Sequence, residues 1–423
     1  MSKFWQEVNY NFAYLNNIDR DKWESDYKSL IEEVQKTEND FEYYRLLQRF
    51  CASLKDGHTN VYLPDTVKRS LLTTNFGEYR LFLQNVENRV IVSRVNSSKK
   101  DEIPIGTEII RVNGTDTESY LKKEVIPYIS SSTEHIALDW ATMSMFQAPI
   151  GISFDITFKL PGGEIKNLHL THSKTIEKEV YPGFEDWKLF EFKWIDKDIA
   201  YVALNSFSNP KINTLFLERL PELYGAKKLI VDLRKNGGGS TYIGRDILQY
   251  LTKDTLLYGS KAKSRLHIPS FKAWGEWTEA QDTIGDKWAT QEYLSYRDNF
   301  FHDFPYKADT IKIEAKRLVI PTVILLGHNT ASAAEDFLIY ADNQPHMTKI
   351  GEPTFGSTGQ PLYFELPGGG EARVCTKMDT YPDGKEFVGH GVMPDIEVSR
   401  TFEDFIENRD TVLEKAIQYL KEK

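Results

Sequence analysis

The chain has 423 residues, and its 52 basic and 62 acidic side chains give a formal net charge of −10. Such a surface repels nucleic acid and anionic membranes, so we expect neither as a partner. Apolar residues make up 40% of the sequence and aromatic residues 13%, which excludes a disordered chain and allows two or three domains with sizeable cores.

Membrane spans, secretion signals and disulfide frameworks are not predicted. The richest apolar run, "RLVIPTVILLG", contains Pro321 and is far shorter than the roughly 18 residues of a membrane helix, so it reads as a buried strand. The N-terminus, "MSKFWQEVNYNF", lacks the basic start and apolar stretch of a signal peptide. The two cysteines, Cys51 and Cys375, form neither a disulfide framework nor a metal pattern.

Residues 1 to 56 read as helical. Apolar side chains recur at steps of three and four at Tyr44, Leu47, Cys51 and Leu54. Gly57 ends this helix within "KDGHTNVYL", which continues as a strand. His58 therefore lies at a helix-to-strand junction, where side chains are often free to do chemistry.

Residues 74–174 are β-rich, with a turn at Asn113-Gly114 and a tight hairpin at Gly162-Gly163. From about residue 190 strand-like and helix-like segments alternate, as in "KKLIVDLR" followed by "KNGGGSTYIGRDILQYL". This alternation predicts an α/β core with parallel strands. The small β-domain thus precedes the larger α/β region.

The stretch 252–317 separates two strand-helix units and is too long for an ordinary connection. It contains nine large aromatic residues: Trp274, Trp277, Trp288, Tyr293, Tyr296, Phe300, Phe301, Phe304 and Tyr306. It is either a lid or substrate-facing insertion, or a satellite core that shields the main sheet. We favour the second interpretation, because aromatic side chains are usually packing residues.

The segment "HNTASAAEDF" places Ser332 between a strand that ends at Gly327 and a helix that begins near Ala331. Backbone N–H groups are unpaired in the first turn of a helix, and the helix dipole there favours negative charge. A hydroxyl at this point can attack a carbonyl while nearby amides receive the developing oxyanion. The alternative is that Ser332 or Thr330 merely caps the helix.

The segment "DLRKNGGGS" follows a buried strand with three successive glycines. Their amides can form an anion-binding nest, so an oxyanion hole and a plain flexible turn are both open. A phosphate loop is the third option, but the Walker pattern with its lysine is missing.

Among nine histidines, His58 is one candidate for a general base, and Asp56 and Thr59 are placed to orient its ring. His328 and His390 are rival bases, since each lies near a glycine-rich loop. The pattern "HLTH", with His169 and His172, is a weak metal signal and reads better as a solvated strand.

The order of the motifs is more specific than any one of them. "LKDGHTNV", "IIRVNG", "IVDLRKNGGG", "NTASAAEDF", "IGEPTFGSTGQ" and "GHGVMPDIEV" follow one another over nearly the whole chain. This series resembles the C-terminal-processing-peptidase and tricorn-core superfamily of serine peptidases, which includes retinoid-binding-protein-like members. The resemblance implies cleavage of peptide bonds near a C-terminus, with no metal or organic cofactor.

The resemblance also implies a fold. The expected α/β core is crotonase-like and ClpP-like, with a superhelical arrangement. Its expected parts are an N-terminal helical segment over residues 1–73, an inserted PDZ-like domain over 74–174, and a peptidase core over 175–423 that contains the insertion 252–317. In the PDZ-like domain, "GTEIIRVNG" has Thr107 where the family usually has aspartate.

The resemblance assigns roles residue by residue. Ser332 matches the nucleophile, and the amides of Ala333 and Gly238 match the oxyanion donors. In the processing-peptidase branch the base is a lysine about 25 residues after the serine, but Ser357 stands at that position here. Lys349 is nearby but precedes the loop and is expected to point elsewhere.

The tricorn-like branch uses a histidine from the N-terminal motif, which matches His58, and supports it with a late glutamate. Gly57 replaces the serine that precedes that histidine in tricorn, and Glu386 is the glutamate near "GKEFVGHGV". The resemblance therefore favours a Ser332–His58 pair.

Two other functions remain open at this point. One is a binding protein for an apolar ligand, with the aromatic insertion as its pocket, and the other is a degraded peptidase that only binds peptides. The joint presence of Ser332 and His58 favours an enzyme acting on a peptide or protein. Family members are often exported, which implies a periplasmic or extracellular location, while the oligomeric state is not indicated.

Overall fold

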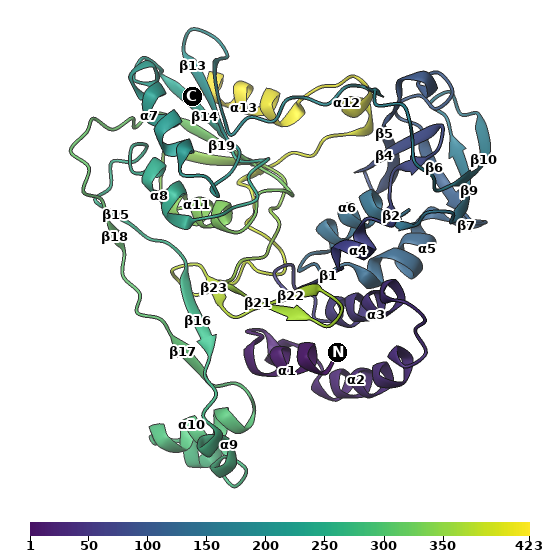
Figure 1. Ribbon diagram of the computed structural model, residues 1–423. Helices are drawn as coiled ribbons and strands as arrows, with labels where there is room; N and C mark the ends of the chain where they lie inside the picture. Colours follow the sequence, from purple (N-terminus) through teal and green to yellow (C-terminus); the bar gives the residue numbers. More distant parts are fainter.

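The computed structural model describes residues 1–423 and shows three packed parts and one projecting arm (Figure 1). The N-terminal part consists of the helices α1 (Ser2–Asn11), α2 (Arg20–Val34) and α3 (Asp40–Ala52). The capping side chain of α3 is Asn39, which accepts a hydrogen bond from the N–H of Glu42. The predicted helical segment is therefore confirmed.

These helices pack on a small antiparallel sheet that joins the two ends of the chain. Strand β1 (Asn60–Tyr62) pairs with β22 (Gly370–Cys375), which pairs with β21 (Pro361–Leu366). The buried side chains between helices and sheet include Phe4, Phe12, Trp23, Tyr44, Phe50 and Val374. The segment that follows α3 is thus fixed by strands more than 300 residues later in the chain.

A second part is a larger antiparallel sheet, which we call the antiparallel sheet. Its strands lie in the order β10-β9-β6-β5-β4-β3. They are β3 (Asn75–Phe76), β4 (Tyr79–Val86), β5 (Arg89–Asn96), β6 (Glu108–Val112), β9 (Ser153–Lys159) and β10 (Ile165–Thr171). The predicted turn at Asn113-Gly114 and the hairpin at Gly162-Gly163 are both present, with Asn113, Gly114 and Gly163 at positive φ.

Short elements complete this part of the molecule. Helix α6 (Glu134–Ser144) packs along β4. The others are α4 (Asp65–Lys68), α5 (Thr117–Tyr120), β2 (Leu71–Leu72), β7 (Thr115–Asp116), β8 (Ala148–Pro149) and β11 (Val180–Tyr181). Helix α12 (Phe402–Ile406) returns from the C-terminal region to cover Val86 and Ile91.

The third part is a six-stranded sheet, which we call the mixed sheet, in the order β12-β13-β14-β19-β20-β24. Five strands are parallel, as the alternation of segments predicts, and β12 is antiparallel to β13. The strands are β12 (Phe190–Trp194), β13 (Ile199–Leu204), β14 (Lys228–Asp232), β19 (Thr322–Leu326), β20 (Met347–Gly351) and β24 (Ile396–Glu397).

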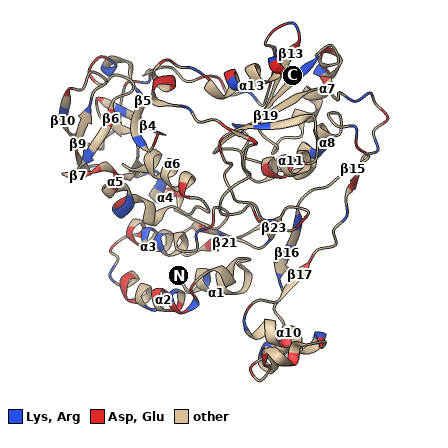
Figure 2. Cartoon of the chain, turned by 180° about the vertical axis from the view of Figure 1, so that it is seen from behind, with Lys and Arg blue, Asp and Glu red and all other residues tan.

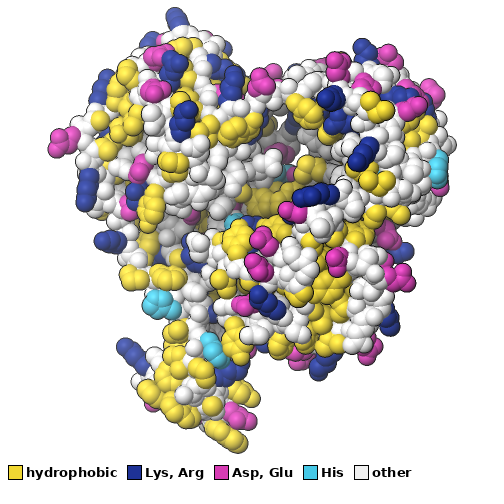
Figure 3. Space-filling model, viewed as in Figure 1, with side chains coloured by type: hydrophobic (Ala, Val, Ile, Leu, Met, Phe, Trp, Pro, Cys, Tyr) yellow, Lys and Arg dark blue, Asp and Glu magenta, His cyan; other side chains and the backbone are white.

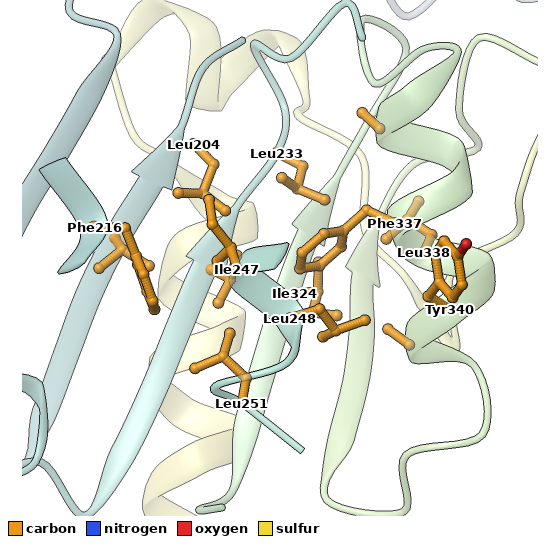
Figure 4. Close-up of a cluster of buried hydrophobic side chains, with 14 of the residues drawn as sticks. Leu204, Phe216, Leu233, Ile247, Leu248, Leu251, Ile324, Phe337, Leu338 and Tyr340 are labelled. Carbon is orange, nitrogen blue, oxygen red and sulfur yellow. The ribbon is translucent and has the colours of Figure 1, made fainter. Parts of the chain in front are cut away.

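Helices cover both faces of the mixed sheet, because alternate strand residues are apolar on both sides. On one face α7 (Lys211–Leu223), α8 (Thr241–Leu248) and α11 (Ala333–Ala341) contribute to the largest core, part of which Figure 4 shows. On the other face α13 (Thr411–Glu422) packs on Ile199, Tyr201 and Ile230. Helix α11, which follows Ser332, is buried along its whole length.

The insertion 252–317 forms an arm that extends from the body (Figure 1). It leaves through β15 (Leu256–Leu257) and β16 (Lys261–Arg265), forms α9 (Pro269–Trp274) and α10 (Lys287–Tyr296), and returns through β17 (Phe301–Asp303) and β18 (Asp309–Thr310). Strand β16 also pairs with β23 (Met378–Thr380) of the body.

The interpretation of this insertion as a satellite core over the main sheet is wrong. Its tip carries exposed apolar side chains, with Trp277 81% and Ile284 84% exposed, and they dominate the tip in Figure 3. Only the two roots of the insertion enter the main core, through Leu257 and Ile311. The aromatic rings pack mainly on one another, as Phe271 does on Trp288 at 4.8 Å between ring centroids.

Acidic and basic residues are interspersed along the chain rather than gathered in one region (Figure 2). Figure 3 shows a hollow in the middle of one face, between the three packed parts, with hydrophobic side chains in it. No helix is both long and apolar enough to cross a membrane.

Candidate active site

Ser332 lies in a tight turn between strand β19 and helix α11. Its backbone adopts φ 56° and ψ −122°, a conformation that L-residues rarely take. Such a conformation costs roughly 1–3 kcal/mol, and it persists only where the surroundings impose it. The sequence placed Ser332 inside the first helical turn, whereas the helix begins one residue later, at Ala333. The hydroxyl-bearing residue is therefore the N-cap.

Glu335 fixes this turn from inside the protein. One carboxylate oxygen, Oε2, accepts the N–H of Ser332 at 2.9 Å. The other, Oε1, accepts the hydroxyl of Thr354 at 2.5 Å and the N–H of Gly356 at 2.8 Å. Burial raises the pKa of Glu335 to about 8 despite these three donors. A single buried side chain therefore connects the serine turn to the loop 354–358.

His58 contacts the same loop from the other side. Its Nδ1 lies 2.7 Å from the Oγ of Ser357, which leaves Nε2 without a protein partner. The side chain is almost fully buried, and this burial, with the nearby positive charges of Arg373 and Lys377, lowers the pKa of His58 to about 4. The imidazole is therefore neutral at neutral pH and able to accept a proton.

Asp56 contacts the same hydroxyl of Ser357 that His58 contacts. Its Oδ1 lies 3.4 Å from the Oγ of Ser357, and its Oδ2 accepts the hydroxyl of Thr59 at 2.6 Å. Burial raises the pKa of Asp56, and the hydrogen bond from Thr59 partly offsets that effect. The arrangement is a chain from Asp56 through Ser357 to His58, in which the aspartate reaches the histidine through a serine.

The loop 354–358 is the common support of both halves of the site. A side chain at Gly57 would meet the ring of Phe355 at 2.6 Å and the Cβ of Ser357 at 3.2 Å, so the histidine motif lies directly on the loop. No direct hydrogen bond joins His58 to Ser332. Catalytic hydrogen bonds are often long before substrate binds, so both residues stay candidates for one site.

The glycine-rich turn approaches the serine closely. A Cβ on Gly238, whose φ is 95°, would stand 2.7 Å from the Cβ of Ser332 and 3.0 Å from the backbone N of Ala333. The N–H of Gly238 donates to the side-chain oxygen of Asn236 at 2.9 Å. The N–H of Ala333 has no partner in the protein, as expected for the first residue of a helix.

The other residues singled out in the sequence lie elsewhere. Glu386 is exposed, and its backbone carbonyl, rather than its carboxylate, is bonded to His390 Nε2 at 3.0 Å. The ammonium of Lys349 pairs with Asp342 and points away from the site. His328 pairs with Asp139 at 2.6 Å. The structure thus brings His58, Ser332, Gly238 and Ala333 to one region and leaves Glu386 without a contact to the histidine.

The weak metal pattern does not form a pair of ligands. His172 is buried, with its two ring nitrogens facing the backbone carbonyls of Asn75 and Phe146. His169 is exposed and bonded to Asp155.

Two residues of the site were missed in the sequence. Ser357 was noted only as the residue that replaces a lysine, and nothing in its local pattern indicates a contact with His58. Glu335 carries a signal that could have found it, because a carboxylate three residues after an N-cap serine is the capping-box pattern.

Comparison with known proteins identifies related peptidases. Residues 198–398 match the profile of peptidase family S41. The chain is 23% identical over 363 residues to a carboxyl-terminal-processing protease of Picosynechococcus sp., covering 84% of this chain and 72% of that protein. It is 26% identical over 215 residues to a carboxyl-terminal-processing protease of Synechocystis sp., covering 50% of this chain and 40% of that protein.

A solved structure supports the fold over the whole length. Mature CPAF complexed with lactacystin superposes with a TM-score of 0.73 at 15% identity, covering 100% of this chain and 98% of that one. The chain is thus a serine peptidase homologous to the carboxyl-terminal-processing proteases, and its residues 198–398 match peptidase family S41.

Proposed function

We propose that Ser332 is the nucleophile and His58 the general base of this peptidase. The Oγ of Ser332 bonds to the carbonyl carbon of the scissile peptide, and its proton passes to Nε2 of His58. The same nitrogen then protonates the leaving amine as the C–N bond breaks. Water, deprotonated by His58, hydrolyses the acyl-enzyme and regenerates the serine.

The observation that carries this proposal is the strained turn at Ser332 beside the unpaired N–H of Ala333. A carbonyl oxygen over this N–H receives a hydrogen bond as negative charge develops on it. Such a donor is worth about 2.7–4 kcal/mol of transition-state stabilisation. Gly238 is proposed as the second donor, and to donate, its N–H has to leave the side chain of Asn236.

The support of the base is proposed to be Ser357 and Asp56 rather than Glu386. A hydrogen bond at Nδ1 selects the tautomer in which Nε2 is free to accept a proton. Ser357 makes that bond, and Asp56 lies behind Ser357. Support from Glu386 would require its exposed carboxylate to move toward His58.

The substrate is proposed to be a peptide or protein that is cleaved near its C-terminus, because the related proteins are carboxyl-terminal-processing proteases. A groove of about 1110 Å³ runs between α3 and the antiparallel sheet and is lined in part by Tyr128, Trp140 and Met143. The ring of Trp140 lies 5.3 Å from that of Phe355, which packs against Ala331 beside the nucleophile. An extended chain in this groove leads toward Ser332.

For the domains we propose the arrangement that the family resemblance implies. The antiparallel sheet with α6 corresponds to a PDZ-like domain, since a helix lies beside a strand whose outer edge is unpaired beyond Leu81. The mixed sheet with its helices corresponds to the crotonase-like core. The proposed boundaries remain 1–73, 74–174 and 175–423.

Labelling by a fluorophosphonate probe, measured by intact mass, tests the proposal. Wild type should be labelled, Ser332→Ala should not, and His58→Ala should be labelled far more slowly. A folded wild type that stays unlabelled, or labelling that persists in Ser332→Ala, contradicts the assignment of the nucleophile. A cleavage assay on a peptide library with free and amidated C-termini then tests the substrate class.

A further inference from the structure

We infer that Asp139 is a positioning residue that ties helix α6 to the loop carrying the nucleophile, through His328. This inference rests on the proposed role of Ser332. The inference gives Asp139 a part in the peptidase site, although this residue lies in the antiparallel-sheet region and belongs to none of the sequence motifs.

Each oxygen of the Asp139 carboxylate has its own partner. Its Oδ2 lies 2.6 Å from Nδ1 of His328, at the start of the serine loop. Its Oδ1 accepts the side-chain N–H of Asn85, on strand β4, at 2.7 Å. The carboxylate therefore bridges strand β4 of the antiparallel sheet and the loop between β19 and α11.

His328 is close enough to Ser332 for its position to matter. Three residues separate them, and the N–H of Gly327 donates to the hydroxyl oxygen of Thr330 within this short loop at 3.1 Å. A displacement of His328 is therefore passed to a turn whose serine already has an unfavourable φ. A misplacement of about 1 Å at a reacting group costs up to roughly a hundredfold in rate.

The same helix also holds the loop 354–358. His135 Nε2 lies 2.8 Å from the carbonyl oxygen of Thr354, and the Thr133 hydroxyl donates to the carbonyl of Phe355 at 3.2 Å. Residues 133–140 thus touch both the loop that carries Ser332 and the loop that supports His58. Asp139 supplies the only ionic contact between α6 and these two loops.

The charges around His328 give this contact a pH dependence. Burial opposes the protonated ring, but the hydrogen bond and charge of Asp139, with the charge of Glu352, outweigh burial and raise the pKa of His328. The ring of His135 lies 4.5 Å away, and its pKa is lowered, chiefly by burial. Arg234, beside Gly327, is already paired with Asp232 and Asp410.

The direction of the effect follows from these groups. A histidine with a raised pKa forms the ion pair fully below its ordinary pKa and loses the pair as the pH rises through the raised value. The hold on the serine loop is therefore strongest at slightly acidic pH and weakens on the alkaline side.

The test compares Asp139→Asn with wild type and with Asp155→Asn. Asp155 forms a histidine–aspartate pair with His169 at 2.7 Å in the same sheet region, but this pair is exposed and does not contact the serine loop. Two quantities are measured from about pH 5 to pH 9: the rate of fluorophosphonate labelling, and hydrogen exchange in the peptide 327–337.

In Asp139→Asn we expect labelling to be roughly ten- to a hundredfold slower, the alkaline decline of wild type to be absent, and exchange in 327–337 to be faster. Asp155→Asn should behave as wild type. Labelling and exchange like wild type in Asp139→Asn overturn the inference, and so does a slower variant that keeps the alkaline decline. If Asp139→Asn does not fold, His328→Gln removes the titrating partner and must abolish the same decline.

Failure of the proposed function gives a different result. If wild type is not labelled at any pH, the nucleophile assignment fails and exchange alone decides the contact. If exchange in 327–337 accelerates only in Asp139→Asn, the inferred contact between Asp139 and the serine loop is supported. If exchange in that variant is unchanged, the inferred contact is contradicted.

Discussion

The loops of the proposed active site and the arm both lie between regular elements, yet they are held in opposite ways. The turn at Ser332 and the loop 354–358 are fixed by the buried side chain of Glu335, which accepts three hydrogen bonds. The tip of the arm is fixed mainly by aromatic rings that pack on one another and stay largely exposed. Irregular backbone can thus be rigid where its polar groups are satisfied internally, and tolerant of change where solvent satisfies them.

The strongest way to break this contrast is Glu335→Ala. The substitution leaves the N–H of Ser332, the N–H of Gly356 and the hydroxyl of Thr354 buried without an acceptor. At about 1–3 kcal/mol for each unsatisfied group, we expect the free energy of unfolding to fall by about 3 kcal/mol or more and labelling of Ser332 to be lost. Urea unfolding measures the first effect and probe labelling the second.

Glu335→Gln is the matched control, because it keeps the volume and one carbonyl acceptor. It should retain part of the stability that Glu335→Ala loses. Equal stability of Glu335→Ala and wild type would show that the serine turn is held by other contacts.

Lowering the pH tests how strongly the loops of the proposed site are held, because the burial of His58 makes the free energy of unfolding depend on pH. Its pKa is lowered from 6.5 to about 4 in the folded protein, so the unfolded chain binds more protons between these values. Stability should therefore fall as the pH drops from 6.5 towards 4, by about 3 kcal/mol from this group alone. Urea unfolding at several pH values should show this slope in wild type and a smaller one in His58→Asn.

The same shift sets the acidic limit of activity. Labelling should persist down to about pH 4–5 instead of declining near the ordinary histidine value. A decline centred near 6.5 would show that His58 is solvated in the working enzyme.

A smaller effect is expected from Ser357→Ala. It removes the partner of Nδ1 and frees the imidazole to change tautomer, while the small side chain leaves little cavity. We expect labelling to slow by roughly ten- to a hundredfold, in line with a lost hydrogen bond of about 1–3 kcal/mol to a catalytic group. Thr358→Ser, a conservative change next to it, should label as wild type. Labelling of Ser357→Ala at the wild-type rate would return the support of His58 to another residue, Glu386 included.

The smallest effect is expected at the arm. Trp277 is 81% exposed, so Trp277→Ser should change the free energy of unfolding by less than about 0.5 kcal/mol and leave the labelling rate unchanged. Loss of labelling in this folded variant would show that the tip acts on the site and would break the contrast.

The sequence indicates the candidate residues of the site, Ser332 and His58, better than it indicates the side chains that hold them in place. The positions of Ser332 at a strand-to-helix junction and of His58 after Gly57 follow from local patterns, and the structure has both junctions. The parallel strands of the mixed sheet follow from periodicity and alternation in the same way.

The contact of His58 with Ser357, and that of His328 with Asp139, could not be predicted. Each joins segments far apart in the chain, by 299 and 189 residues, and depends on how separate parts pack. The interpretation of the arm as a buried core is wrong because aromatic content alone does not indicate burial. Its rings pack on each other at the end of a narrow ribbon, and no local pattern distinguishes that arrangement from a buried core.

The pairing of β1 with β22 has a consequence for biosynthesis. The strand after His58 finds its partner only when residues 370–375 have been made, and Ser357 follows His58 by 299 residues. At roughly 5–20 residues per second, about 15–60 s pass between translation of the histidine and of its partner. The proposed base is therefore made long before the proposed nucleophile, Ser332, and the site cannot assemble on a ribosome-bound chain until residues 370–375 have been made.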